Sequence, residues 1–296
     1  MPEALTIIFS GFLGVAIGSF LNVVILRSGR GESPLKGRSK CQTCGQELSW
    51  KELIPVASYV IQKGRCLHCG AVLSLQYPLV ELATGILFAI TAWQYLQYPV
   101  SSIQYLSIPS ILVSVLILSG FFAVISSFLV ILLTDLYWQI IPDGATLVLT
   151  LVGVGATITR RFYCVIREIP SSPTDAGIFY QNSCGGWPAA SYDLLFAICF
   201  LLFFAALWFF SKGRGMGFGD VKLIFATSLL LGFPASLAAF LFSFWLGGLT
   251  GAALLVFNRG GLKTKIPLGP FILAGSVIAY FTTDKFLAAS GLYHFL

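Results

Sequence analysis

The chain has 296 residues, of which 57% are hydrophobic and only 10% are charged, and its mean hydropathy is +0.87. Because a soluble domain carries about 25% charged residues, this composition excludes a soluble globular protein and indicates an all-α polytopic membrane protein. The net charge of +6 does not indicate nucleic-acid binding. Its basic residues lie in loops between apolar runs, where they report orientation in the membrane.

The first apolar run, residues 5–26, contains no charged residue and is long enough to cross a membrane. No basic region precedes it and Glu3 lies near its start, so we expect a retained anchor rather than a cleaved signal peptide. Asn22 in this run is a polar group that needs a partner, and we expect it to join two helices.

Seven further apolar runs bring the expected number of transmembrane helices to about eight. The run 221–233 is short for a span, so we expect it to begin in the preceding glycine-rich stretch or to be covered by neighbours. The seven runs are residues 78–93, 108–134, 144–159, 194–210, 221–233, 235–257 and 268–282.

The polar insert at residues 27–76 carries eight Lys or Arg, which places it in the cytoplasm. With eight spans, fourteen Lys or Arg fall in inside loops and four in outside loops, and a second polar loop, 160–192, lies outside. The four outside residues are Arg160, Arg161, Arg167 and Lys285.

Two acids lie where apolar runs meet inside loops. Asp135 opens D-L-Y-W-Q-I-I-P-D, and Asp220 lies in the glycine-rich stretch 213–222. Ionisable groups at membrane depth are functional candidates. Two close carboxylates share one proton, so one can act as a base on water while the other polarises a scissile carbonyl. We therefore predict an aspartyl protease dyad; the competing interpretation is two unrelated acids that cap helices or pair with Lys222.

Neighbouring residues of the two acids support or limit this prediction. Gly217 and Gly219 would let backbone or substrate approach closely. Asp143 lies just before the run 144–159, where we expect an N-cap carboxylate rather than a catalytic group. Serine-type catalysis lacks a partner, because the histidines are His68, between two cysteines, and His294.

Four of the seven cysteines form two C-x2-C pairs separated by 21 residues in the insert: Cys41, Cys44, Cys66 and Cys69. This spacing predicts a tetrahedral zinc site of structural type, since four thiolates leave no open position. The metal would help a small insert to fold. Cys164 and Cys184 lie together in the outside loop, where a disulfide or two free thiols are the alternatives.

Several segments in the same order resemble the bacterial type IV prepilin leader peptidases, which also serve type II secretion pseudopilins. The similarity covers most of the chain. It comprises the two C-x2-C pairs together with G-S-F-L-N-V-V-I-L-R (18–27), E-L-I-P-V-A-S-Y (52–59), G-R-C-L-H-C-G (64–70), Y-P-L-V-E (77–81), D-L-Y-W-Q-I-I-P-D (135–143) and G-M-G-F-G-D-V-K (215–222).

This resemblance implies that Asp135 and Asp220 are catalytic, with Gly217, Gly219, Lys222 and Asp143 as supporting residues. It implies cleavage of a short basic leader from a prepilin at the cytoplasmic face, just after a glycine and before an apolar helix. Many members then N-methylate the new terminus with S-adenosylmethionine, and those members tend to keep the cysteine-bearing insert.

By resemblance alone, Tyr77 and Glu81 are candidate contributors to methylation. The long loop 160–192 with its cysteine pair departs from the family pattern.

The expected organisation is a first transmembrane helix (1–26), a zinc-binding insert that contributes to methylation (27–76) and a transmembrane peptidase part (77–296). The expected location is the bacterial cytoplasmic (inner) membrane, with lipid and prepilins or pseudopilins as partners and no nucleic acid. The sequence leaves open whether the enzyme forms a homo-oligomer.

Two other functions compete with this interpretation. A membrane thiol–disulfide oxidoreductase could use the C-x2-C pairs and the outside cysteines, although the charge count puts these two groups on opposite sides. A transporter could use Asp135 and Asp220 as proton relays, but no inverted repeat supports it.

Overall fold

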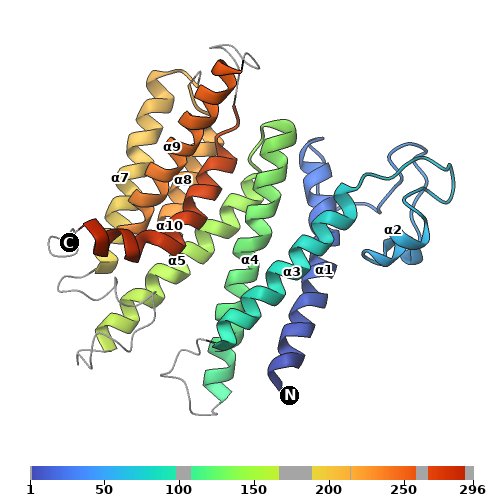
Figure 1. The fold of residues 1–296 in the computed structure, drawn as a ribbon, viewed down its shortest axis with the longest axis horizontal. Helices are drawn as coiled ribbons and strands as arrows, with labels where there is room; N and C mark the ends of the chain where they lie inside the picture. Colours follow the sequence, from blue (N-terminus) through green and yellow to red (C-terminus); the bar gives the residue numbers. More distant parts are fainter. Residues whose placement is uncertain (1, 98–107, 167–188, 214, 258–265, 291–296) are drawn as a thin grey trace. The chain divides into compact units, whose positions relative to one another are not determined.

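The structure is a computed structural model that describes residues 2–97, 108–166, 189–213, 215–257 and 266–290. In these ranges the chain forms helices and loops, and its β-type pairings are two isolated bridges, Lys40 with Glu47 and Arg65 with Val72 (Figure 1). The chain divides into two compact units, Met1–Tyr137 and Trp138–Leu296.

The first unit contains three long helices, α1 (Pro2–Ser28), α3 (Gln76–Gln97) and α4 (Ile108–Trp138). The insert between α1 and α3 holds a 3-10 turn, η1 (Trp50–Leu53), and a short helix, α2 (Ala57–Ile61).

Helix α1 packs directly along α3. A Cβ atom at Gly14 would lie 2.7 Å from the Thr84 carbonyl oxygen, and one at Gly18 would lie 2.8 Å from the Cα of Glu81. Small residues are what allows two membrane helices to approach this closely. The stacked rings of Phe88 and Phe122, with centroids 4.0 Å apart, connect α3 to α4.

The second unit contains α5 (Asp143–Ile166), α7 (Ala189–Phe210), α8 (Phe218–Leu231), α9 (Ala235–Val256) and α10 (Gly269–Ser290). Helix α8 contacts each of the other four. It follows Gly217, which has an extended backbone, and it stops before Gly232. With a φ of +72° and a ψ of 174°, Gly232 takes an extended backbone conformation of positive φ that favours glycine.

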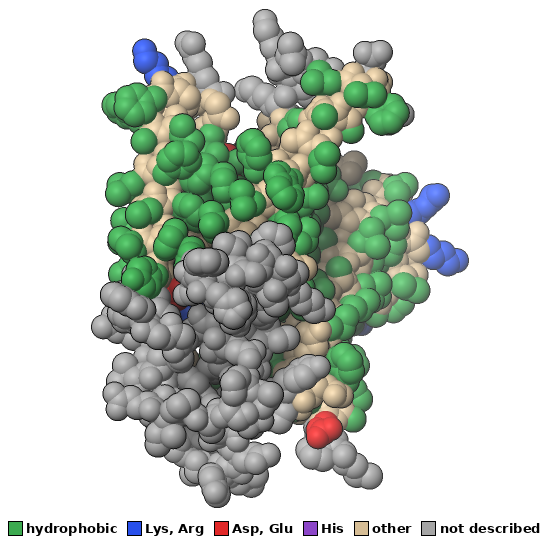
Figure 2. All heavy atoms as spheres, turned by 60° about the vertical axis from the view of Figure 1, so that its left-hand side comes forward, with side chains coloured by type: hydrophobic (Ala, Val, Ile, Leu, Met, Phe, Trp, Pro, Cys, Tyr) green, Lys and Arg blue, Asp and Glu red, His purple; other side chains and the backbone are tan. Residues whose placement is uncertain are grey.

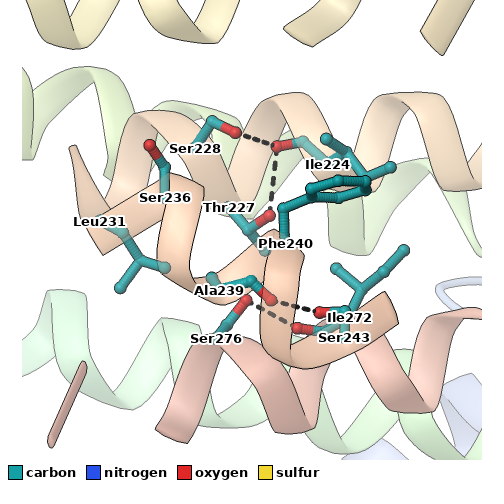
Figure 3. A pocket seen from close by; sticks show the side chains of 10 residues that line it. All are labelled: Ile224, Thr227, Ser228, Leu231, Ser236, Ala239, Phe240, Ser243, Ile272 and Ser276. Atoms are coloured by element: carbon teal, nitrogen blue, oxygen red, sulfur yellow. Dashed lines mark hydrogen bonds between the residues drawn. The ribbon is translucent and has the colours of Figure 1, made fainter. Parts of the chain in front are cut away.

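A small cavity of about 10 Å³ lies between α8, α9 and α10, and it is lined partly by hydroxyl groups (Figure 3). Ser228, Ser243 and Ser276 each donate to the carbonyl oxygen four residues earlier in their own helix, at 2.6–2.7 Å. The volume is about that of one water molecule. The Ser236 hydroxyl, which also lines the cavity, has no hydrogen-bond partner among the described residues. Small residues let these three helices pack closely.

Among the described residues, five helices are long and apolar enough to cross a membrane. Helices α5, α8 and α10 lie at the other three predicted runs. Figure 2 shows that hydrophobic side chains dominate the described part of the face that it presents. The predicted all-α polytopic membrane fold is therefore confirmed. The five spans are Glu3–Ser28, Gln76–Gln97, Leu112–Trp138, Tyr192–Phe210 and Ala235–Val256.

One helix boundary differs from the prediction, and the difference moves a charged residue from a loop into a helix. Helix α5 continues to Ile166, so Arg160 lies on a helix and not in an outside loop 160–192. Its guanidinium is mostly buried beside Asp193 of α7, and this pairing explains why a charged residue continues an apolar helix. Much of the rest of that loop, residues 167–188, lies outside the described ranges.

Candidate functional site

The four cysteines of the insert meet at one point. Their sulfur atoms all lie within 4.8 Å of one another, and the sulfurs of Cys41 and Cys69 are 3.9 Å apart. Four thiolates arranged tetrahedrally at about 2.3 Å from a zinc ion would be about 3.8 Å from each other. The cluster therefore can hold a metal ion, and the predicted gathering of these residues is confirmed.

The two C-x2-C segments adopt the same turn. In the first, Cys41 N–H donates to the Gln46 carbonyl and Gly45 N–H donates to the Cys41 carbonyl, both at 2.9 Å, and Gly45 has a φ of +72°. In the second, the equivalent 2.9 Å bonds involve Cys66, Ala71 and Gly70, and Gly70 also has a φ of +72°. The same backbone turn thus occurs twice, and each copy presents two sulfurs. The residues between the cysteines differ in the two segments, so the sequence does not show this repeat.

Backbone hydrogen bonds prepare one member of the cluster, Cys41, for a cation. The backbone N–H groups of Cys44 and Thr43 lower the pKa of Cys41 to about 6. A thiol must lose its proton to bind a metal. All four cysteines of the cluster are free rather than disulfide-bonded.

Glu52 supports the second turn, a role that the sequence analysis missed. Its carboxylate accepts the backbone N–H and the hydroxyl of Ser49, both at 2.8 Å, and lies 3.4 Å from Nε2 of His68. Hydrogen bonds from the Ser49 N–H and the Ser49 hydroxyl lower the pKa of Glu52, and the neighbouring His68 contributes less. His68 is 43% exposed, as expected for a surface residue of the insert.

Tyr77 and Glu81 of α3 both connect the insert to the membrane helices. Gln42, which lies between two metal-ligand cysteines, donates to the Tyr77 hydroxyl at 2.9 Å, and Asn22 of α1 donates to the Tyr77 carbonyl at 3.1 Å. The buried Glu81 carboxylate accepts Val56 N–H at 2.7 Å. Asn22 therefore joins two helices, as predicted.

Asp135 lies in the last turn of α4 and is only 4% exposed. It belongs to the first unit. A carboxylate buried at the end of an apolar helix agrees with the position predicted for it.

Asp220 lies in the first turn of α8, in the second unit. Gly217 N–H donates to its Oδ2 at 3.1 Å, so the carboxylate satisfies one of the free donors at the helix start. Gly219 is needed for a close approach, because a Cβ there would lie only 3.0 Å from the Cβ of Ile141. The chain that follows α4 therefore passes directly against the residue beside Asp220.

Lys222 and Asp143 form an ion pair at 2.7 Å across α8 and α5. Asp143 is the first residue of α5, and its carboxylate accepts a hydrogen bond from the Lys222 ammonium. The Lys222 ammonium also lies 5.1 Å from the centre of the Phe218 ring. Cys184 and the side chain of Cys164 lie outside the described residues, so the predicted disulfide stays a prediction.

These features define a class of polytopic membrane protein that has four clustered cysteines in a polar insert and acids at the ends of membrane helices. A model described as Bacterial Peptidase A24 N-terminal domain matches residues 12–95, and one described as Type IV leader peptidase family matches residues 122–252. The chain belongs to the type IV leader peptidase family and is a peptidase.

Relatives from several bacteria carry the name prepilin leader peptidase/N-methyltransferase. The protein of Bacillus subtilis is 31% identical over 284 residues, covering 96% of each chain. That of Pseudomonas putida is 26% identical over 315 residues, covering 98% of this chain and 95% of its own. That of Myxococcus xanthus is 48% identical over 81 residues, 27% of this chain and 24% of its own. No solved structure matches. Family membership and the free thiols do not favour the oxidoreductase alternative.

Proposed function

We propose that this protein removes the basic leader from type IV prepilins or type II secretion pseudopilins, with Asp135 and Asp220 as a catalytic dyad. The similarity to prepilin leader peptidases over nearly the whole chain carries this proposal. The positions of the two acids support it. Asp135 is buried in the last turn of α4, and Asp220 lies in the first turn of α8, so each acid is at the end of an apolar helix.

The proposed chemistry uses one shared proton. The ionised aspartate takes a proton from water as the water oxygen bonds to the scissile carbonyl carbon, and the protonated aspartate donates a hydrogen bond to the carbonyl oxygen. Collapse of the tetrahedral species breaks the C–N bond, and a proton passes to the leaving amine. Lys222 and Asp143 support the site by fixing the start of α8 against the start of α5.

The test is cleavage of a prepilin in membranes that carry the wild type, Asp135→Asn or Asp220→Asn at matched protein levels. Both substitutions should abolish cleavage. Glu32→Gln is the control, because it removes an exposed acid of the insert that takes no part in the proposed site, and it should keep substantial activity. Residual cleavage by either Asp135→Asn or Asp220→Asn would assign that acid a structural role.

We further propose that the cysteine cluster binds a structural zinc ion. Four sulfur donors at this spacing suit zinc, and they leave no position for a reactant. Elemental analysis of the purified protein should find zinc in equal amount to the chain and lose it when Cys66 and Cys69 are both replaced by Ser. Zinc content that survives this double substitution would contradict the assignment.

The names of the relatives suggest a second activity, methylation of the new N-terminus. S-adenosylmethionine would supply a methyl cation equivalent to the amine, which loses a proton. We infer that Tyr77 and Glu81 serve as positioning residues in this activity, because their polar atoms already hold Gln42 and Val56 of the insert. Mass spectrometry of processed pilins should show methylation in the wild type and its loss in Glu81→Leu.

The membrane placement is also part of the proposal. The excess of basic residues in the insert and in the loops after α7 and α9 supports a cytoplasmic position for the insert and both acids, in the inner membrane. Labelling of cysteines in the insert should therefore require a reagent that crosses the membrane.

A further inference from the structure

A buried ion pair in the second unit has no part in the proposed chemistry. Arg160 of α5 and Asp193 of α7 meet at 3.2 Å between Nε and Oδ2, and their side chains are only 11% and 7% exposed. Burying two charges is costly unless both are paired and hydrogen-bonded. The burial of this pair therefore needs an explanation, and the other hydrogen-bond partners of the two side chains provide one.

Those partners lie at the end of α8. This helix has 14 residues, which gives a length of about 21 Å, whereas the hydrocarbon core of a membrane is about 30 Å thick. If α8 starts at one surface, it ends within the apolar layer. The last carbonyl groups of a helix have no partner inside the helix, and they cannot remain unpaired in lipid.

The guanidinium of Arg160 supplies these carbonyls with donors. Its Nη1 donates to the Leu230 carbonyl at 3.0 Å and its Nη2 to the Leu229 carbonyl at 2.8 Å. Thr157, one turn earlier on α5, donates to the same Leu229 carbonyl at 3.2 Å. A cation at the carboxyl end of a helix is also favoured by the helix dipole.

Asp193 holds the other side of the same turn. Its Oδ1 accepts Phe233 N–H at 2.7 Å, just past the end of α8. A Cβ at Gly232 would lie 2.7 Å from that oxygen, so only glycine leaves room for the carboxylate. The Phe233 ring also stacks on Phe196 of α7, with centroids 4.1 Å apart.

We propose that Arg160 and Asp193 form a clamp that fixes the axial position of α8, and thereby the depth of Asp220 at its opposite end. They are positioning residues, and their effect on catalysis rests on the proposed role of Asp220. The fork of a guanidinium is required, because one group must reach a carboxylate and two carbonyls together. Without the clamp, the carbonyl end of α8 moves toward the far membrane surface and draws its start into the lipid.

The experiment compares Arg160→Lys and the doubly apolar Arg160→Leu/Asp193→Leu with the wild type. Thr159→Leu is the control, an exposed position one residue away whose hydroxyl bonds only within α5. Prepilin cleavage in membranes gives kcat and KM at matched protein levels. In parallel, a cysteine placed at the exposed Phe218, at the start of α8, is labelled with a maleimide that does not cross lipid, and labelling without that cysteine is subtracted.

Arg160→Lys should lower kcat by about tenfold or more and leave KM within about twofold, with slower labelling at position 218. The doubly apolar variant should accumulate normally, because no charge is left unpaired, yet show the same two defects. Wild-type kcat and labelling in either variant would overturn the clamp. If the wild type itself cleaves no prepilin, the proposed function fails, and labelling at position 218 still decides the clamp.

Discussion

At the scale of single residues, Val56 shows how the insert is tied to the membrane helices. Its φ of +60° and ψ of −51° are rare for a β-branched residue, and Ala57 N–H closes a tight turn onto the Pro55 carbonyl. Such a conformation costs about 1–3 kcal/mol and persists only where the surroundings hold it. The Glu81 carboxylate, which accepts Val56 N–H, is the group that holds it.

Glu81→Leu should therefore release the segment around Val56. The loss of a charged acceptor is worth about 1.5–3 kcal/mol, so trypsin should cut the insert faster in membranes. A second substitution, Val56→Gly, should recover part of the resistance, because glycine adopts a positive φ without strain. Unchanged proteolysis in Glu81→Leu, or no recovery in the double variant, would show that Glu81 does not hold this turn.

Glu52 leads to a prediction about pH. Its pKa is lowered in the folded insert, mainly by Ser49 N–H. A group with a lowered pKa stabilises the fold fully above its unfolded pKa and loses that effect as pH falls through the folded pKa. Glu52→Gln should thus release metal to a chelator faster than the wild type. The ratio of the two release rates should stay constant between about pH 6 and pH 8, because Glu52 is ionised throughout this range. A ratio that changes within this window, or equal release rates in the two proteins, would contradict this role of Glu52.

Some of these interactions can be predicted from the sequence, and others cannot. Two C-x2-C pairs predict a thiolate cluster because metal geometry restricts the spacing of its ligands. The bond between Glu81 and Val56 joins residues 25 apart that share no periodic pattern, so only the folded backbone brings them together. The same holds for Arg160 and Asp193, which charge counting places in or near a loop.

At the scale of elements, the start of α8 depends on space beside Gly219. A Cβ there would meet Ile141 at 3.0 Å, whereas a Cβ at Gly215 would lie 3.7 Å from Ser211, an ordinary contact. The two glycines belong to one stretch of sequence and differ only in what surrounds them. This difference makes them a matched pair for substitution.

Gly219→Ala should reduce prepilin cleavage, because overpacking costs about 1–3 kcal/mol and is relieved only by moving α8 or the Ile141 segment. Gly215→Ala should cleave close to the wild-type rate. The measurement is the initial cleavage rate at matched protein levels. Equal rates for both variants would mean that glycine at 219 is not required by this contact.

Element boundaries were harder to predict than element positions. Each apolar run became a helix, but α4 extends past Asp135 and α5 extends past Arg160. Hydropathy ends a run at the first charged residue, whereas a helix continues wherever that charge finds a partner. Asp193 is that partner for Arg160.

At the scale of the whole molecule, the two matched family regions correspond to different chemistry. The N-terminal match covers the metal cluster and its connections to α1 and α3, and the second match covers both proposed catalytic acids. The membrane helices hold together through packing of small and apolar residues. The insert, by contrast, has few buried residues besides Cys41 and Cys66.

Metal removal should therefore separate the two proposed activities, cleavage and methylation. The binding free energy of a structural zinc ion, about 10–16 kcal/mol, is folding free energy for a small metal-dependent segment, so a strong chelator should unfold the insert. We expect cleavage to continue and methylation of the cleaved product to stop, both measured on one pilin sample by mass spectrometry. Cys199→Ser removes an exposed thiol outside the cluster and should leave both activities and their response to the chelator unchanged. Cleavage that falls in step with metal loss would show instead that the peptidase also depends on the insert.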